Sequence, residues 1–435
     1  SRGSREVLSS SLEINHVMHA LTFTSITGWR ESDLELEKGL DGADSQDYLI
    51  ASGKREDYDH FSQEFRLSSV QSPLYWTAGF VFSQEDLERD NTESLKVALL
   101  ARGFDELHRE GTSDSYALYA DASRELTARL NLTGGLRYTY EDKEISLSGE
   151  YQATLAGTGP GQAVYNDDQP ELEQKQTESW DYLSARLLLD YRLRKDTMLY
   201  GSVSNGFKSG GFYSLNISPD MDISYDEEEL INYEVGLKGQ YLDNSLHLGI
   251  TAFYYEHENL QELQLTGQRA PIYRLHTSDA QGHGAEIEAL WLASPRFTLA
   301  GNYSYVDTNY SRVSSIDAAP GPWSGTPHHK VNLSLQYAWQ MPELGLLIPR
   351  LDSTWVDERG NAGSGPYGEI EAFTLTNARI TWLPGASNWE LALWSTNLFD
   401  EQAHLYTGDN GSVLGALTPI RIPPRMYGAD FVYHF

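Results

Sequence analysis

The strongest constraint in this sequence is a period-two alternation of apolar and polar residues that recurs in many separate segments. The last eleven residues, RMYGADFVYHF, show the pattern at its clearest. Successive side chains of a β-strand point to opposite faces, so this stretch predicts a strand with one apolar, aromatic face and one small or polar face. The apolar face would carry Tyr427, Ala429, Phe431, Tyr433 and Phe435, and the other face Met426, Gly428, Asp430, Val432 and His434. A strand between lipid and water has this pattern, and so does one strand of a soluble sandwich.

The alternation is not confined to the C-terminal segment. It recurs in LTARLNLTGGLRYTYED (126–142), INYEVGLKGQYL (231–242) and SLHLGITAFYY (245–255). The polar faces carry charges in register along one segment after another. A wide, water-filled lumen would solvate such a face.

The connections between these segments alternate between short and long. The short connections are at 122–126, 193–197, 241–245, 293–297 and 383–387. The long ones are at 32–57, 88–113, 141–176, 208–227, 258–282, 306–327, 356–370 and 400–423. Soluble domains keep most loops short, whereas outer-membrane barrels have short turns at one rim and long loops at the other. The sequence therefore predicts an all-β, transmembrane, antiparallel up-and-down β-barrel with about seventeen strands of about ten residues or more.

Helical periodicity is weak in this sequence, with one exception. In ESLKVALLARGFDELHRE (93–110), apolar residues recur at helical spacing. The segment predicts a short amphipathic helix within a long loop.

The composition excludes several classes of protein. The 435 residues include no cysteine, which rules out disulfide bridges, thiol catalysis and zinc–thiolate sites. The formal charge of −31 argues against nucleic-acid binding, which needs clustered Lys and Arg. No apolar run has the roughly 20 residues of a transmembrane helix, and the first residues contain no signal peptide. The 27 Tyr and 10 Trp suit aromatic girdles at a membrane interface, or a tyrosine-rich soluble β protein.

Motifs for catalysis are absent from the sequence. YYEHENLQ (254–261) has Gln where the zinc-helix motif needs its second His, and GTGPGQ lacks the Lys of a P-loop. Histidines occur near expected strand ends at His276, His283, His328, His329 and His404. Because adjacent residues of a strand face opposite ways, His328 and His329 would not both reach a lumen. We therefore expect no enzyme, no cofactor and no metal site.

Several segments, in order along nearly the whole chain, resemble the barrel of TonB-dependent outer-membrane receptors. They are GLRYTYEDK (135–143), YGSVSNGFKSGGFY (200–213), NYEVGLKGQYLDNSLHLGITAFYYEHENLQ (232–261), HGAEIEALW (283–291), FTLAGNYSYVDTNY (297–310), GTPHHKVNLSLQYAW (325–339), LALWSTNLFDEQ (391–402) and YGADFVYHF (427–435). No single segment is diagnostic, but the ordered set is strong evidence for the resemblance.

The resemblance implies that residues 1–435 are the C-terminal part of a barrel of 22 strands. The N-terminal plug domain, its energy-coupling box and about five strands would not be in this chain. We therefore expect a gap between the strand near residues 5–16 and the last strand. The resemblance also identifies the C-terminus as the signal that the barrel-assembly machinery reads, with Tyr427, Gly428, Phe431, Tyr433 and Phe435 as its residues.

Two motifs are candidate parts of the lumen wall. Glu234, Gly236 and Lys238 would face inward together, which predicts ion pairing along the wall or contact with a plug, with a transport relay as the alternative. NGFKSGGFY (205–213) would place Lys208 and Tyr213 where a strand leaves the outer rim, and its glycines allow tight bends.

The candidate ligand-binding residues all lie at the expected outer mouth. Arg side chains pair with carboxylates or phenolates, and aromatic rings stack on catechols. The candidates are Lys208, Tyr213, Arg274, His276, Trp323, Arg359 and Tyr406. Interface anchoring or loop packing would explain each of these residues equally well.

The function that the resemblance implies is ligand-gated active import across the outer membrane of a Gram-negative bacterium, of a ferric siderophore in the first place. Its partners would be the TonB–ExbB–ExbD complex acting through the plug, the barrel-assembly machinery, the ferric chelate, lipid and lipopolysaccharide, but no nucleic acid. Haem, cobalamin or an oligosaccharide are alternative ligands. A passive porin and a soluble all-β protein are alternative classes.

Overall fold

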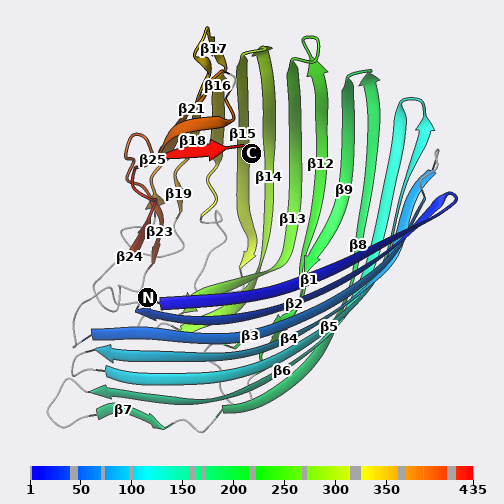
Figure 1. Cartoon of the computed structure of the whole chain (residues 1–435). Coiled ribbons are helices and arrows are strands. Elements are labelled where there is room, and N and C mark those ends of the chain that lie inside the picture. Colours follow the sequence, from blue (N-terminus) through cyan, green and yellow to red (C-terminus); the bar gives the residue numbers. More distant parts are fainter. Residues whose placement is uncertain are drawn as a thin grey trace.

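The computed structural model of the protein describes residues 2–39, 48–69, 74–97, 101–156, 163–168, 172–214, 222–266, 272–313, 325–360, 369–385, 387–408 and 418–434. These residues form strands joined by turns and loops (Figure 1). The strands are β1 Arg2–Met18, β2 Leu21–Gly39, β3 Tyr48–Ser69, β4 Leu74–Val97, β5 Ala101–Thr127, β6 Leu130–Ala156, β7 Ala163–Asp168, β8 Leu172–Arg194, β9 Thr197–Lys208, β10 Gly211–Phe212, β11 Ser224–Tyr225, β12 Glu228–Tyr241, β13 Leu246–Thr266, β14 Ile272–Ser294, β15 Phe297–Val313, β16 His329–Tyr337, β17 Trp339–Met341, β18 Gly345–Val356, β19 Arg359–Gly360, β20 Glu369–Ile370, β21 Phe373–Leu383, β22 Trp389–Thr396, β23 His404–Gly408, β24 Thr418–Arg421 and β25 Met426–Tyr433.

One antiparallel sheet contains nineteen of these strands. β7 is a short addition that pairs with β6, and β17 continues β16 along the edge of β18. The other seventeen follow one another in chain order, from β1 to β6, then β8, β9, β12 to β16, β18, β21, β22 and β25. The up-and-down order and the strand number confirm the prediction.

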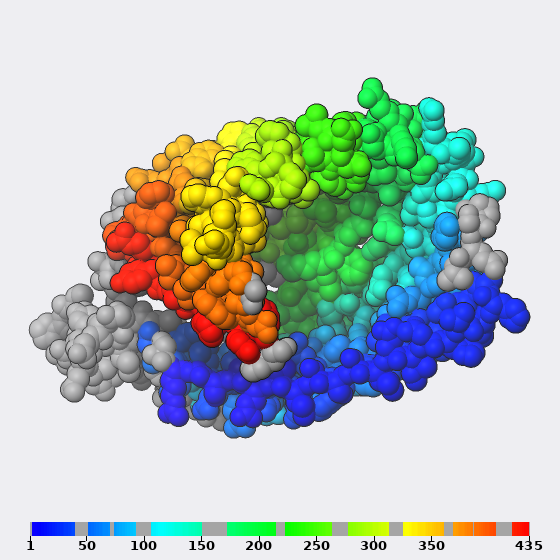
Figure 2. Space-filling model, turned by 45° about the horizontal axis from the view of Figure 1, so that its top comes forward, coloured from blue at the N-terminus to red at the C-terminus, as the bar shows by residue number. Residues whose placement is uncertain are grey.

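The sheet curves strongly around a hollow and stays open. In Figure 1, β1 to β6 run across the molecule, whereas β12 to β16 run along its height, and Figure 2 looks into the hollow that the curved wall surrounds. β1 pairs with β2, and β25 pairs with β22. Within the described part of the chain no pairing joins β1 to β25, which confirms the predicted gap.

The convex face of the wall carries an apolar band. Cross-strand partners such as Ile250 and Ile287, or Ile380 and Leu393, keep apolar residues side by side. Their large apolar side chains are exposed, Leu136 by 58%. Exposed apolar surface of this extent on a regular sheet is what lipid covers.

Two rows of aromatic side chains border this band. One row lies near the short turns and includes Tyr191, Trp291, Tyr337 and Tyr433. The other lies nearer the long loops and includes Tyr138, Tyr233, Tyr254 and Tyr427. Amphipathic rings take such positions at the two interfaces of a membrane. The arrangement agrees with the predicted transmembrane barrel.

The C-terminal strand has the two faces that its sequence predicts. Tyr427 and Phe431 are exposed on the convex face, by 82% and 65%. Asp430 faces the other way, where it accepts hydrogen bonds from Arg379 Nη1 at 2.6 Å and Trp394 Nε1 at 3.1 Å. Phe435 lies outside the described residues.

The concave face differs from the prediction around Glu234 and Lys238. The two residues form no ion pair with each other in the described structure. Instead, the Tyr200 hydroxyl donates to Glu234, and the Lys238 ammonium lies 5.3 Å from the centre of the Tyr200 ring. Gly236 leaves the space for that ring, because a Cβ there would be 2.5 Å from Tyr200. The tyrosine therefore replaces the expected ion pair.

The predictions for the first long loops were wrong. Most of 32–57, 88–113 and 141–176 is strand, because β2 to β6 extend beyond the apolar band as paired hairpins. The predicted turn at 122–126 is also strand, and the chain turns at 128–129 instead. The predicted turns at 193–197, 241–245 and 293–297 are confirmed.

The helix predicted at 93–110 is wrong as well. β4 and β5 pair in register through this segment, from Glu88 opposite Glu110 to Val97 opposite Ala101. The pairing of a whole hairpin outweighs a short helical periodicity. No described helix is long and apolar enough to cross a membrane.

The two faces of β16 allow a test of the membrane assignment. Leu333 is 52% exposed on the convex face, and Ser334 faces the lumen opposite Asp352. In the full-length protein in lipid, Leu333→Arg should lower the free energy of unfolding by about 2–4 kcal/mol, because the charge enters hydrocarbon. Urea unfolding in vesicles measures this.

Ser334→Arg is the matched control, since the same charge enters water beside a carboxylate. It should change the unfolding free energy by less than about 1 kcal/mol. Equal losses in the two variants would contradict the assignment of the faces.

Candidate functional site

We name the two ends of the wall by their connections. The short-turn rim carries the turns at 128–129, 195–196 and 295–296, and the long-loop rim carries the connection from β9 to β12 and those after β18 and β22. The strands place polar and aromatic side chains on the concave face towards the long-loop rim, where the described loops fold inward.

The connection from β9 to β12 packs against the concave face. Its Ile223 is 1% exposed and contacts Ile145 and Leu147 of β6. Phe212 packs on the same cluster. The Tyr213 amide donates to the Ile223 carbonyl at 2.7 Å, which closes the small hairpin of β10 and β11. Buried apolar contacts therefore hold this loop inside the hollow.

A polar network anchors the beginning of the loop. Lys143 Nζ donates to the Gly210 carbonyl at 2.9 Å and to Ser209 Oγ, and lies 3.0 Å from Glu141 Oε2. The same ammonium lies 5.5 Å from the centre of the Trp180 ring. A Cβ on Gly210 would be 2.2 Å from Trp180 Nε1, so only glycine allows this close approach.

Glu228 anchors the end of the loop. It accepts from the Gln261 amide at 2.9 Å, and lies 2.7 Å from His257 Nε2 and 3.3 Å from Lys208 Nζ. Burial alone would raise the pKa of Glu228, but these partners outweigh burial and hold its pKa below the ordinary value. Glu228 is therefore a stable anion that ties β9, β12 and β13 together.

A second group of loops packs around β19 and β23. Arg359 donates from Nη2 to the Leu405 carbonyl at 3.1 Å and lies 6.0 Å from the centre of the Phe373 ring. Phe373 belongs to a buried apolar cluster with Val356, Ala403 and Ile422. Arg359 is thus partly engaged in holding the loops together.

The structure brings the predicted ligand residues together in two groups. Lys208 and Tyr213 belong to the β9–β12 connection, and Arg359 lies beside the strand that carries Tyr406, which pairs with Ile420. No described contact joins the two groups. Arg274 and His276 pair along β14 with Gln264 and Glu262, but their side chains, that of Tyr406 and all of Trp323 lie outside the described residues.

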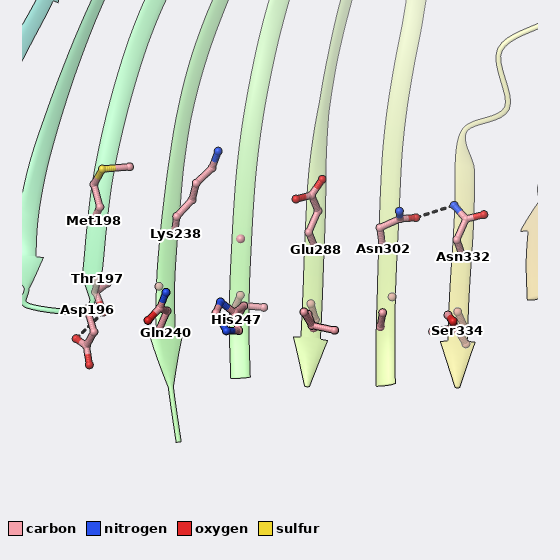
Figure 3. Close-up of a pocket in the computed structure, with 18 of the residues that line it drawn as sticks. Asp196, Thr197, Met198, Lys238, Gln240, His247, Glu288, Asn302, Asn332 and Ser334 are labelled. Atoms are coloured by element: carbon pink, nitrogen blue, oxygen red, sulfur yellow. Dashed lines mark hydrogen bonds between the residues drawn. The ribbon is translucent and has the colours of Figure 1, made fainter. Parts of the chain in front are cut away.

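A recess of about 880 Å³ lies on the concave wall near the short-turn rim (Figure 3). Lys238, Glu288 and Ser334 line it, and Asn332 donates to Asn302 at 2.6 Å. The described residues contain no group of three or more potential metal ligands. The recess can make hydrogen bonds and ion pairs over a broad surface, as contact with another protein segment requires.

Sequence reasoning missed Lys143 and the arginines Arg89 and Arg109. Lys143 is the last residue of the segment GLRYTYEDK (135–143). Only the fold brings it to Ser209 and Gly210. Arg89 and Arg109 fall in 88–113, which was assigned to a loop. The period-two order of Leu87, Arg89 and Asn91 was the available signal, and it was weak because both faces there are polar.

Comparison with known proteins identifies a family whose model matches most of this chain. The family model described as "TonB dependent receptor-like, beta-barrel" matches residues 8–398. The pesticin receptor of Yersinia pestis is 23% identical over 312 residues, which cover 69% of this chain and 41% of that protein. The metal-pseudopaline receptor CntO of Pseudomonas aeruginosa is 26% identical over 221 residues, covering 50% and 30%. The chain thus matches less than half the length of these relatives.

Solved structures share the fold. The ferric yersiniabactin uptake receptor FyuA from Yersinia pestis superposes with a TM-score of 0.79 at 17% identity, covering 99% of this chain and 61% of that one. The ferric-catecholate import receptor Fiu from E. coli K12, in its closed form, gives 0.74 at 14% identity, covering 100% and 64%. At these identities the likeness concerns the fold alone.

The close packing of Gly210 against Trp180 predicts the effect of adding a methyl group at position 210. Gly210→Ala in the full-length protein should release the loop, because the added Cβ collides with Trp180 and with the backbone carbonyl of Tyr225. Limited trypsin digestion should then cleave faster after Lys208, and hydrogen exchange in 209–214 and 222–227 should increase.

Gly206→Ala is the matched control, since a Cβ there meets nothing within 4 Å. It should leave digestion and exchange unchanged. Similar behaviour of both variants would show that the close approach at Gly210 does not hold the loop.

Proposed function

This chain belongs to the TonB-dependent receptor family, in its β-barrel part, and from this premise we propose that the protein imports a ferric siderophore by ligand-gated active transport. The match over residues 8–398 is the observation that carries the proposal. Family members are receptors of the Gram-negative outer membrane, and their fold is that of transport receptors rather than enzymes.

The ligand site that we propose is the long-loop rim. Lys208 and Tyr213 stand on a loop that reaches into the hollow, and the Lys208 side chain is 60% exposed. Arg359 stands at the edge of the second loop group. With Arg274, His276, Trp323 and Tyr406, these residues would contact the chelate. A loop held by contacts on both sides can change its position when a ligand replaces some of them.

We propose that the chain forms the C-terminal part of the barrel and that a plug and about five further strands complete it. The backbone groups along the free edge of β1 support this, because unpaired groups in lipid cost several kcal/mol each. The greater length of the relatives agrees with it. The TonB–ExbB–ExbD complex would act on the plug, and the recess near the short-turn rim would be the part of the wall that the plug contacts.

The proposal extends to assembly. Tyr427, Gly428, Phe431, Tyr433 and Phe435 would form the signal that the barrel-assembly machinery recognises. The exposure of Tyr427 and Phe431 on the convex face supports this, since the machinery must reach them before lipid does. Lipid and lipopolysaccharide would then cover the apolar band.

A chelate of another metal is the second candidate ligand. One relative of 26% identity is a metal-pseudopaline receptor, and that name does not specify iron. Haem, cobalamin or an oligosaccharide would use the same barrel. A passive porin would differ in needing no energy.

Energy coupling is the first test. Deletion of the coupling box from the full-length protein should abolish uptake of the radiolabelled ferric chelate but leave its binding to cells unchanged, because binding and force act on different parts. Uptake that persists after the deletion would contradict active import, and conductance of the intact protein in planar bilayers without added force would indicate a porin.

Ligand class is the second test. A strain that lacks the protein should grow poorly under iron limitation when one siderophore of a panel is the only iron source, and the cloned gene should restore growth. If every ferric chelate still enters while another metal chelate, cobalamin or a glycan no longer does, the siderophore assignment is wrong.

A further inference from the structure

Two arginines lie opposite each other on the concave face, beyond the apolar band. Arg89 of β4 pairs directly with Arg109 of β5, and Arg109 pairs with Leu147 of β6. Directly paired residues of an antiparallel sheet share a face. Leu147 is 1% exposed because Ile223 of the folded loop covers it, so this face is the inner one. Like charges in direct opposition destabilise a sheet unless something neutralises them.

Among the residues that the structure describes, one carboxylate pairs with this group. Glu56 of β3 lies opposite Arg89, with Glu56 Oε2 2.5 Å from Arg89 Nη2 and 2.7 Å from Lys54 Nζ. Lys54 and Arg89 therefore share one anion, and with Arg109 beside them the group carries three positive charges and one negative charge, a net +2. We call these four residues the arginine pair site.

Neighbouring acids do not restore the balance. Asp90 lies on the convex face, where its Oδ1 is 2.7 Å from His108 Nδ1. Glu85 is on the concave face but four residues along β4 from Arg89, about 13 Å away at the rise of a strand. Glu85 faces Tyr58, and burial together with that carboxylate raises the pKa of Tyr58 to about 12. Glu88 and Glu110 also occupy the convex face, so Glu56 is the described carboxylate that pairs with the group on the concave face.

Arg109 carries the unmatched charge. Its Nε is inaccessible to solvent and has no hydrogen-bond partner, and no described residue forms an ion pair with its guanidinium. Burial, then Arg89, lowers the pKa of Arg109 to about 10. A guanidinium has five donors in a fixed fork that fits a carboxylate. Arg109 as a whole is only partly buried, so its terminal nitrogens, rather than Nε, are the donors open to an anion from the hollow.

We propose that the arginine pair site binds a carboxylate of the ligand, and that the imported chelate is therefore an anionic, carboxylate-bearing one. The inference rests on the proposed import function. It adds to that proposal that the ligand is negatively charged, and that it is also bound by strand residues outside the loops. The carboxylate takes the fork of Arg109 from the hollow and relieves the repulsion from Arg89. The folded loop lies beside it, through Ile223 on Leu147.

The test begins with anion binding by the purified full-length protein, because this readout needs no transport. Thermal unfolding is followed while citrate is titrated, with sodium chloride of equal ionic strength as the reference. Citrate should raise the melting temperature of the wild type beyond the effect of chloride, because a ligand that binds the folded state stabilises it. If citrate and chloride raise the melting temperature equally, the effect is charge screening and not binding, and the inference is overturned.

Arg109→Met tests the residue. It should remove the citrate-dependent rise and, without citrate, leave the melting temperature equal or higher, because it removes a buried like charge. Arg55→Met is the matched control, since Arg55 lies on the other face of β3 and is 71% exposed. It should keep the citrate effect. Loss of the citrate effect in both variants, or in neither, would overturn the inference.

Arg109→Lys keeps the charge and removes the fork. It should weaken citrate binding by about tenfold, since one charge-assisted hydrogen bond contributes about 1.4 kcal/mol or more, a tenfold change in the dissociation constant. Unchanged binding would overturn the geometric part of the inference. This variant also keeps the test valid if Arg109→Met fails to fold.

Chelate binding then separates the two proposals. A ferric chelate with free carboxylates should bind Arg109→Met about tenfold or more weakly than wild type, and a neutral ferric hydroxamate should bind both alike. If wild type and Arg109→Met bind the carboxylate chelate equally, the inference is overturned, whereas the import proposal stands as long as uptake is intact. If no chelate is taken up but citrate still binds through Arg109, import fails and the anion site remains.

Discussion

The hydrogen-bond ladder between neighbouring strands is the interaction on which this structure depends. Hydrocarbon contains no water to replace a missing backbone partner, so a chain can cross it with strands only if every amide and carbonyl is paired sideways. Seventeen consecutive antiparallel strands meet this requirement between β1 and β25, and in the described residues no pairing joins the two outer strands. The alternation of side chains, the apolar band and the aromatic rows all follow, because pairing fixes which face each residue occupies.

The same ladder continues beyond the membrane and positions polar chemistry there. β5 and β6 have 27 residues each, about 90 Å along the strand, whereas 9–11 residues cross a bilayer. Arg89, Arg109 and Glu56 therefore stand on paired strands, as does Lys143, which holds the folded loop. Groups on strands have more precisely fixed positions than groups on loops. The interior near the long-loop rim is thus a rigid wall with a loop packed against it.

Much of the fold was predictable from sequence, and the limits have a physical cause. Inside the membrane the lipid requires one apolar face, so Leu136, Tyr138 and Tyr140 marked their strand clearly. Beyond it, water contacts both faces, so Asp86, Glu88 and Asp90 alternate with a set that includes the polar Arg89 and Asn91 as well as Leu87. The apolar–polar alternation disappears from the sequence there, although β4 and β5 still pair. For this reason the sequence of 88–113 predicts a loop. The network at Gly210 depends on residues 67 apart in the chain, which no local pattern reveals.

The charge of the site could not be inferred from the charge of the chain. A net charge of −31 argues against binding to nucleic acid, a polyanion. That sum counts residues on both faces equally, yet exposed charges on the convex face are separated from the hollow by the sheet and by water. At short range the balance inverts, because Lys54 and Arg89 share Glu56, Arg109 lies beside them, and Asp90 turns outward to His108. Because successive residues of a strand point to opposite faces, charged residues are divided between the convex and the concave face. An acidic protein can therefore present a cationic surface to a ligand in the hollow.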